Sequence, residues 1–187
     1  MKPTRLGLIA DTHMPGSLRD LWPQVFDAFA EVDAILHAGD LHTLSIVDQL
    51  ETLAPTYVAR GNGDRGLEDD RLKDVWLLEF GGVHIGMVHH FPRPNRRTEE
   101  DVRRRLAKHF DERQPNVVVY GHTHRESIDY LDDILCINPG SPTLPRNQST
   151  RMGTIGILEI HEHSLDASIF QITEQGVELH TDHYDFD

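Results

Sequence analysis

The amino-acid sequence predicts an α/β sandwich, in which two packed sheets carry helices on their outer faces. Two observations support this fold class. The first half of the chain alternates short apolar runs with amphipathic segments, a pattern typical of parallel strands joined by helices. The second half is richer in apolar runs separated by Asp, Gly or Ser, which is typical of antiparallel strands.

In the first half, apolar runs predict three strands at residues 6–10, 34–36 and 57–59. Apolar residues from Leu18 to Phe29 recur at intervals of three and four, which predicts a helix that either begins at Pro23 or is kinked there. A second helix is expected over residues 44–54. Because parallel strands end at the same edge of a sheet, we expect a ligand site at that edge.

In the second half, residues 75–80 and 83–88 flank Gly81-Gly82 and predict a β-hairpin. A helix is expected from about residue 98 to residue 113, with Thr98 and Asp101 spaced as a capping box. Further strands are expected at residues 116–120, 128–131, 134–137, 154–160 and 167–172. The C-terminal residues 175–187 are acidic, and we expect them to fray.

The chain has 187 residues, which is close to the usual size of one domain, and we expect a single domain over residues 1–187. The sequence has no run of about 18 uncharged apolar residues, and its first residues do not resemble a signal peptide. We therefore expect a soluble, cytoplasmic protein. Its one cysteine, Cys136, excludes an intrachain disulfide and a cysteine-based metal cage, and its apolar neighbours predict a buried position.

The chain carries 18 basic and 31 acidic residues, so its net charge is −13. This charge disfavours nonspecific binding to nucleic acid and to anionic membranes. The chain also has 13 histidines, which is unusually many for its length. Their meaning depends on where they lie in the sequence.

Polar residues follow the ends of five predicted strands. They are Asp11-Thr12-His13, Gly39-Asp40, Gly61-Asn62-Gly63-Asp64, His89-His90 and Gly121-His122-Thr123-His124. Each motif alone has a simple structural explanation, since Asp40 could cap the next helix and His89 could be a hydrogen-bonded core histidine. Taken together, at five strand ends and with glycine at the turns, the motifs predict a metal site.

The ligand types in these motifs indicate the metal. Imidazole and carboxylate groups without thiolates suit manganese, iron, cobalt, nickel or zinc, and do not suit calcium. Asp40 lies between the two histidine-bearing halves of the sequence, so it is the candidate for a carboxylate that binds two cations. Two cations about 3.5 to 4 Å apart would lower the pKa of a bridging water, which is suited to hydrolysing a phosphate ester.

The ordered motifs D-x-H, G-D, G-N-x-D, H and G-H-x-H resemble those of the calcineurin-like metallophosphoesterases. The stretch Asn138-Pro139-Gly140-Ser141 and the following Pro145-Arg146 are similar to the small bacterial and archaeal phosphodiesterases of the YfcE/MJ0936 type. The resemblance implies the metallo-dependent phosphatase fold, a four-layer α/β/β/α sandwich of two mixed sheets flanked by helices. It also implies a dinuclear centre often filled by manganese, with Fe, Zn, Ni or Co as other candidates.

The resemblance assigns roles to individual residues. The first metal would be bound by Asp11, His13 and His124, the second by Asn62, His89 and His122, and Asp40 would bridge the two. The catalytic candidates are Asp40 and Asn62 of this ligand set, together with His90, which the family pattern does not supply. The stretch of residues 138–141 is expected to hold the loop beneath the site rather than to act in catalysis.

The sequence departs from the family pattern at two positions. Gly63 stands where many larger relatives carry a histidine that is thought to protonate the leaving oxygen, which argues against efficient phosphomonoester hydrolysis. His90 stands where relatives usually carry glycine. Two interpretations of His90 remain open: it replaces the missing proton donor, or it faces solvent.

Three arginines follow His90 and are candidates for substrate binding, because guanidinium groups suit phosphate oxygens: Arg93, Arg96 and Arg97. Pro92 and Pro94 make a rigid, solvated loop an equal alternative. The run Arg103-Arg104-Arg105 is expected to be a solvated helix face. Histidines outside the motifs are expected to be strand or surface residues, and His109→Ala is taken as a silent control: His37, His42, His84 and His109.

The function expected from these features is that of a metal-dependent phosphodiesterase, acting on a small or nucleotide-like phosphodiester through a metal-bridging hydroxide. The first alternative is a noncatalytic scaffold like the retromer subunit, whose metal site is degraded. All seven expected ligands are present here, which favours the enzyme. A phosphomonoesterase or protein phosphatase is disfavoured by Gly63. We expect no membrane partner, and the oligomeric state is left open between a monomer and a homodimer.

Overall fold

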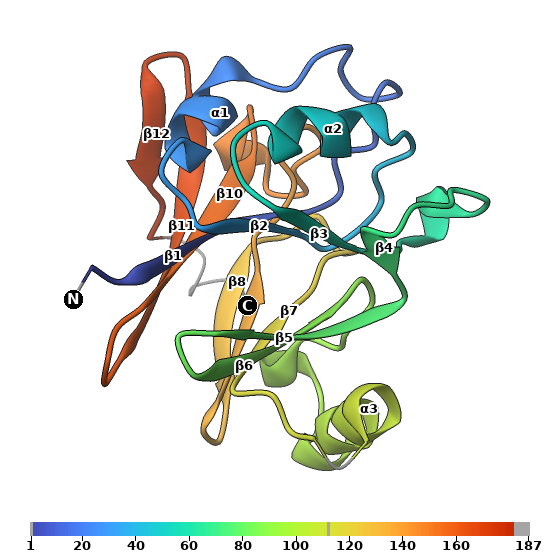
Figure 1. The fold of residues 1–187 in the computed structure, drawn as a ribbon, viewed down its shortest axis with the longest axis vertical. Helices are drawn as coiled ribbons and strands as arrows, with labels where there is room; N and C mark the ends of the chain where they lie inside the picture. Colours follow the sequence, from blue (N-terminus) through green and yellow to red (C-terminus); the bar gives the residue numbers. More distant parts are fainter. Residues whose placement is uncertain (1, 112, 182–187) are drawn as a thin grey trace.

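The computed structural model describes residues 2–111 and 113–181, which form two mixed sheets packed face to face (Figure 1). Helices α1 (Pro23–Phe29) and α2 (Ser45–Glu51) cover the outer face of the first sheet, and α3 (Glu99–Phe110) covers the second (Figure 1). The layers are therefore helix, sheet, sheet and helix. The expected α/β/β/α sandwich is confirmed.

The first sheet has seven strands in the order β12-β11-β10-β1-β2-β3-β4. One half is parallel and consists of β1 (Thr4–Ile9), β2 (Ala34–His37), β3 (Thr56–Ala59) and β4 (Leu72–Lys73). The other half is antiparallel and consists of β10 (Thr154–Ile160), β11 (Leu165–Thr173) and β12 (Gly176–Leu179). The two halves join where β10 pairs antiparallel with β1.

The second sheet has five strands in the order β5-β6-β7-β9-β8. Its parallel centre consists of β6 (Val83–Val88), β7 (Val117–Val119) and β9 (Ile134–Asn138). Its antiparallel edges are β5 (Val75–Phe80) and β8 (Ser127–Leu131). In the described part of the chain, 3₁₀ turns lie in the loops at Asn62–Asp64, Pro94–Arg96 and Gln148–Thr150.

Three apolar layers hold the sandwich together. Leu36 and Val119 belong to the layer between the sheets, and Phe29 and Leu50 belong to the layer under α1 and α2. The third layer packs Val102, Leu106 and Phe110 of α3 against the second sheet. Cys136 is fully buried in this third layer, as expected. Each sheet face or helix stripe that the sequence makes apolar thus has a partner.

The helix boundaries follow from local chemistry. Pro23 occupies the first turn of α1, so the helix begins there, because proline lacks the N–H group that an earlier turn would need. Thr98 Oγ1 accepts a hydrogen bond from the Asp101 N–H group (3.3 Å) and caps α3, which ends at Phe110 and not at residue 113. None of the helices in the described ranges is long and apolar enough to cross a membrane.

The predicted hairpin is confirmed, with Phe80 paired to Val83 across Gly81 and Gly82. Both glycines have positive φ values, 56° and 79°. Such values are required at the two central positions of the tight turn that matches the twist of a hairpin.

Two strands were not expected. The two-residue β4 is too short to show a periodic pattern, and it forms because Leu72 pairs beside Val58 of β3. Residues 176–179, which we expected to fray with the acidic C-terminus, instead form β12, where Val177 pairs with Ile172 of β11. Residues 182–187 lie outside the described residues.

The fold brings the five polar motifs to one place. Strands β1, β2 and β3 are parallel in the first sheet, and β6 and β7 are parallel in the second. The motifs follow the carboxyl ends of these five strands, so they form one group of loops at the edge where the two sheets meet.

Candidate metal centre

The first group of ligand atoms comes from the loops after β1 and β7. His13 Nε2 and His124 Nε2 lie 3.0 Å apart. Asp11 Oδ1 is 4.0 Å from His13 Nε2 and 3.7 Å from His124 Nε2. A metal ion between these three atoms could be bound by all of them.

The second group comes from the loops after β3, β6 and β7. Asn62 Oδ1 lies 3.3 Å from His89 Nε2 and 3.1 Å from His122 Nδ1. The two histidine nitrogens are 3.3 Å apart. This group is more open to solvent, because Asn62 and His122 are exposed while His89 is buried.

Asp40 lies between the two groups and presents a different oxygen to each. Its Oδ2 atom is 3.5 Å from His13 Nε2, and its Oδ1 atom is 3.5 Å from His89 Nε2. Oδ1 also accepts a hydrogen bond from the Gly63 N–H group (2.7 Å), which fixes the carboxylate plane. One carboxylate therefore faces both groups.

Hydrogen bonds outside the cluster determine which ring nitrogens carry protons. His89 Nδ1 lies 2.7 Å from the Ala38 carbonyl oxygen, and His124 Nδ1 lies 2.8 Å from the Leu144 carbonyl oxygen. A carbonyl oxygen only accepts, so each Nδ1 carries the proton and each Nε2 presents a lone pair to the cluster. Histidines that bind metals are held in the same way.

These lone pairs face other electron-pair donors. His89 Nε2 faces Asn62 Oδ1 and Asp40 Oδ1, and both oxygens are acceptors. Such atoms repel one another unless a cation lies between them. The combination of nitrogen and oxygen donors without sulfur fits a divalent first-row metal ion.

The charges of the cluster also indicate a site for a divalent metal ion. Burial, followed by the negative charge of Asp40, raises the pKa of the Asp11 carboxyl well above its ordinary value. Among the described residues, only histidines lie within ion-pair distance of Asp11 and Asp40. Burial also lowers the pKa of His13 to about 4, so its ring is neutral at physiological pH. A divalent cation would supply the positive charge that these two buried acids lack.

The backbone is strained at the same residues. Nine described residues other than glycine have positive φ values, and six of them lie in the cluster or touch it: Asp11, His13, Asp40, His42, His122 and His124. This left-handed conformation costs about 1 to 2 kcal/mol for such a residue. Strain of this kind concentrates at functional sites, where the surrounding structure enforces it.

Asp64 holds the Asp40 loop in place. Its carboxylate accepts four backbone N–H groups, from Asp40 (2.9 Å), Leu41 (2.7 Å), His42 (3.0 Å) and Gly61 (2.8 Å). Burial alone would raise the pKa of Asp64, but these N–H groups and His37 lower it below its ordinary value. The last residue of the G-N-x-D motif is thus a structural anion.

His37, which we had placed only as a strand residue, connects two of the ligand loops. The Gly39 N–H group donates to His37 Nδ1 (3.1 Å), so the ring proton is on Nε2 and is donated to Thr12 Oγ1 (3.1 Å). Burial lowers the pKa of His37 to about 4, which keeps the ring neutral. The loops of Asp11 and Asp40 are therefore tied through one buried imidazole.

The stretch of residues 138–141 supports the loops from below, as expected. Asn138 Nδ2 donates to the Gly121 carbonyl oxygen (3.0 Å) and to Thr123 Oγ1 (3.1 Å). Ser141 Oγ donates to the Asp11 carbonyl oxygen (2.8 Å). Both side chains are fully buried, so they position the ligand loops and do not meet solvent.

His42 was not expected to take part in the site. Its Nε2 atom lies 2.9 Å from His13 Nδ1, so it fixes the ring of a candidate ligand. Its ring also fills the space beside Gly63, where a Cβ atom would lie only 2.5 Å from it. The φ angle of Gly63 is outside the left-handed region, so this glycine is required by the His42 ring and not by the backbone turn.

The other expected site residues divide into two groups. His90 is exposed at the rim, with its ring centre 4.7 Å from that of His122. Arg97 and His90 together line a cavity beside α3, which is separate from the cavity at the second ligand group described below. Arg96 is exposed, and neither of these cavities is lined by it. Arg93 Nε lies 3.6 Å from Asp129 Oδ2, in a mostly buried pair that is absent from the lining of both cavities.

A cavity of about 570 Å³ opens beside the second ligand group, and Asn62, His89 and His122 line part of it. His109 of α3 lines the same cavity. We expected His109 to be a strand or surface residue, but it lies on α3 and lines the cavity of the second ligand group, so His109→Ala is unsuited as a silent control. His163, whose side chain is 89% exposed on the β10–β11 link, serves better.

The layered fold and the ligand loops at its strand ends are those of a metallophosphoesterase. A family model described as the calcineurin-like phosphoesterase superfamily domain matches residues 4–163. The chain belongs to this superfamily, whose members use divalent metal ions. The family resemblance of the sequence motifs is confirmed.

Individual relatives agree with this assignment. A probable metallophosphoesterase of Methanothermobacter thermautotrophicus is 38% identical over 168 residues, which cover 89% of this chain and 91% of the relative. The phosphodiesterase MJ0936 of Methanocaldococcus jannaschii is 27% identical over 164 residues, which cover 83% of this chain and 92% of the relative. The solved structure of Vps29 from Cryptosporidium parvum has a TM-score of 0.77 at 17% identity, covers 96% of this chain and 97% of that chain, and shows the fold alone.

The role of Asp64 predicts a pH-dependent loss of stability. We expect Asp64→Asn to lower the free energy of unfolding by about 2 kcal/mol at neutral pH, because four N–H groups lose a charged acceptor. The lowered pKa means that the stabilisation is complete above the unfolded-state value of about 4 and is lost as the pH falls through the folded-state value. Urea unfolding across this range measures the effect, with Asp70→Asn, at an exposed acid, as the control. Equal stability of Asp64→Asn and the wild type at neutral pH would contradict the role.

The contact between His42 and Gly63 predicts that two substitutions are coupled. Gly63→His should destabilise the protein by about 1 to 3 kcal/mol, because the new side chain overlaps the His42 ring. Adding His42→Gly should restore most of this loss. Urea unfolding of both single variants and the double variant gives the coupling energy. Purely additive effects would show that the His42 ring does not occupy this space.

Proposed function

We propose that the chain is a two-metal phosphodiesterase that hydrolyses a small phosphodiester. When bound, two divalent cations lower the pKa of a shared water and polarise the phosphoryl oxygens. The observation that carries the proposal is the position of Asp40, whose two oxygens face two separate groups of lone pairs. A single-metal site has no need for this arrangement.

Two groups of residues would each hold one of the two metal ions. Asp11, His13 and His124 would hold the first metal, and Asp40 would hold both. Asn62, His89 and His122 would hold the second metal. Because Asn62 and His122 are the exposed members, the substrate would approach from their side.

His90 lies at this exposed side and is the candidate proton donor for the leaving oxygen. Its ring stands against that of His122, at the mouth of the cavity. Burial, followed by the proximity of His122, lowers the pKa of His90, so a neutral ring predominates at neutral pH. This supports only a weak role as an acid and agrees with a preference for esters whose leaving groups need no proton.

We propose Mn²⁺ as the native metal. The donor set combines two carboxylates and an amide oxygen with four imidazoles, and this mixture suits manganese. Iron, zinc, nickel and cobalt would also bind imidazole-rich ligands. Metal analysis of the purified protein would test whether manganese is the native metal.

A noncatalytic scaffold is the second candidate function, and the similarity in fold to Vps29 favours it. The oriented lone pairs and the strained ligand backbone support the enzyme, because a scaffold gains nothing from them. Tight metal binding without hydrolysis of any phosphate ester would favour the scaffold.

Metal binding is expected to stabilise the folded protein. Mn²⁺ at about 100 times its dissociation constant should add about 2.7 kcal/mol to the free energy of unfolding, seen as a raised melting temperature of chelator-treated protein. Asp40→Asn should abolish most of this gain and reduce hydrolysis by more than about a hundredfold, because one carboxylate serves both groups. His163→Ala is the control. A normal metal-dependent shift and normal turnover in Asp40→Asn would remove Asp40 from the bridging role.

The rate is expected to depend steeply on the leaving group. Gly63 supplies no proton donor, so aryl diesters such as bis-p-nitrophenyl phosphate should be hydrolysed readily and alkyl monoesters poorly. A series of esters with graded leaving-group pKa, run on the wild type and on His90→Ala, measures the slope. A shallow slope in the wild type that becomes steep in His90→Ala would show that His90 already protonates the leaving oxygen.

A further inference from the structure

Three consecutive arginines on α3 differ in their partners. Arg103 pairs with Glu99 (2.7 Å) and with Asp132. Arg104 pairs with Glu100 (3.4 Å) and Asp101 (3.2 Å). Arg105 is half-buried and has no carboxylate partner among the described residues. In a chain with 31 acidic residues, an arginine left without one is a feature to explain.

Arg105 lines the cavity of about 570 Å³ that opens beside the second ligand group. The same cavity is lined by the candidate ligands Asn62, His89 and His122. A molecule in this cavity could therefore reach the metal centre at one end and the Arg105 guanidinium at the other. The volume lies within the range of small-ligand sites and exceeds what one phosphate group needs.

His109 adds a second unsatisfied group to the same wall. It lies four residues after Arg105, so both side chains project from one face of α3 into the cavity. Its Nε2 atom is buried and has no hydrogen-bond partner in the described structure. A buried nitrogen without a partner is unfavourable, and a ligand oxygen would satisfy it.

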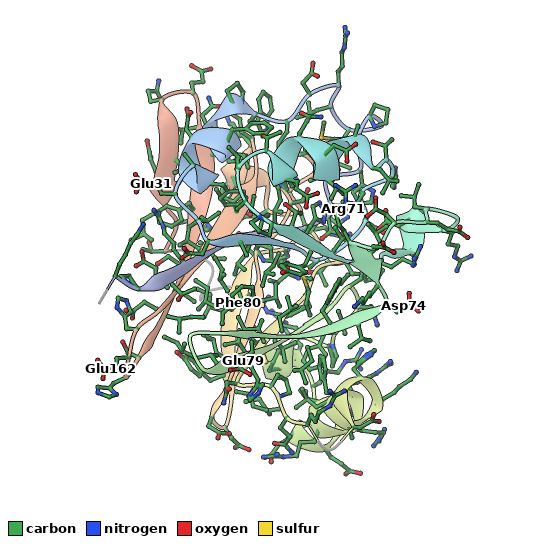
Figure 2. The ribbon with its side chains drawn as sticks, in the orientation of Figure 1. Glu31, Arg71, Asp74, Glu79, Phe80 and Glu162 are labelled. Carbon is green, nitrogen blue, oxygen red and sulfur yellow. The ribbon has the colours of Figure 1, made fainter. Side chains whose placement is uncertain are left out.

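Two further arginines line the cavity, and only one of them forms an ion pair with a described carboxylate. Arg60 pairs with Asp74 (3.2 Å), which is labelled in Figure 2 and lies in the link between β4 and β5. Arg65 is exposed and makes no ion pair with a described residue. Arg65 and Arg105 thus give the cavity two uncompensated positive charges, which attract an anion despite the net charge of −13.

The side chains that line the cavity are almost all polar. Apart from histidines, no aromatic side chain of the described residues lines the cavity, and Val88 is its one apolar side chain. Guanidinium groups form paired hydrogen bonds with phosphate oxygens. The chemistry therefore fits an anionic, oxygen-rich group.

We propose that this cavity, walled by Arg65, Arg105 and His109, binds a second phosphate group of the substrate. The substrate is then a phosphodiester that carries a further phosphate on the part lying toward α3. This inference rests on the proposed phosphodiesterase function. The second phosphate could belong to a small nucleotide or to the end of a nucleic-acid chain.

Two substrates that share a leaving group test the proposal. They are thymidine 5′-(p-nitrophenyl phosphate) with and without a 3′-phosphate. We expect the wild type with Mn²⁺ to show a KM about tenfold lower for the 3′-phosphorylated ester, as one charged hydrogen-bonded contact would give. Arg105→Gln should raise the KM of the 3′-phosphorylated ester more than the KM of the plain ester, and so remove this advantage. Arg105→Lys should retain part of it.

The matched control is Arg103→Gln, which changes the same residue type two positions earlier on the same helix but outside the cavity. It should keep the full advantage of the 3′-phosphate. His109→Gln changes another residue that lines the cavity, and it should lose part of the KM advantage of the 3′-phosphorylated ester. No advantage in the wild type, or equal losses in Arg103→Gln and Arg105→Gln, would overturn the subsite and leave the phosphodiesterase function standing.

A binding measurement separates this inference from the proposed function. Calorimetric titration of the chelator-treated protein with inorganic phosphate should show binding about tenfold weaker in Arg105→Gln than in the wild type and in Arg103→Gln. If no ester is hydrolysed, the proposed function fails and this titration alone decides the anion site, with equal binding by all three proteins overturning it. A lower KM for an oligonucleotide that carries the same 5′-(p-nitrophenyl phosphate) than for the 3′-phosphorylated ester would assign the phosphate to a nucleic-acid end, and a higher KM would assign it to a small nucleotide.

Discussion

Asp11 and Asp40 are buried beside each other, and no described lysine or arginine compensates them. Two carboxylates in such surroundings destabilise a fold unless hydrogen bonds and a cation stabilise them. The chain supplies the hydrogen bonds itself, from the His122 N–H group to Asp11 (3.0 Å) and from the Gly63 N–H group to Asp40 (2.7 Å). A divalent metal ion would supply the remaining positive charge, and the neutral histidines around the acids are suited to bind one.

The strained ligand loops are held by buried polar groups that do not reach the solvent. Asp64 gathers four N–H groups of two loops, and His37 ties the Asp11 loop to the Asp40 loop. The left-handed residues sit between these fixed points, so the strain is spread over many hydrogen bonds. The ligand positions are therefore set before a metal arrives, which lowers the entropic cost of binding it.

The sequence was informative where a physical rule links a local pattern to a position in space. Parallel strands end at one edge, so the motifs after five strands could be assigned to one site, and Pro23 located the start of α1 because proline fits the first helical turn. The rule failed where the partner is distant in sequence. The sequence around Arg105 does not distinguish its role from that of Arg103. Arg103 pairs with Asp132, whereas Arg105 lines a cavity that residues of distant loops help to enclose. His42 likewise fills the space beside Gly63 from another loop, which no spacing within either motif reveals.

The pairing of β1 with β10 determines the order in which the first sheet can form during synthesis of the chain. Thr4 of β1 lies opposite Ile160 of β10. One edge of β1, the central strand of the first sheet, therefore stays unpaired until residues near 160 have been synthesised. Until residues 154–160 leave the ribosome, β1 can pair with β2 but offers open N–H and C=O groups on its other side. An exposed strand edge in a nascent chain is prone to aggregate, and contacts this far apart form slowly. The two halves of the first sheet therefore join only after the last third of the chain has begun to be made.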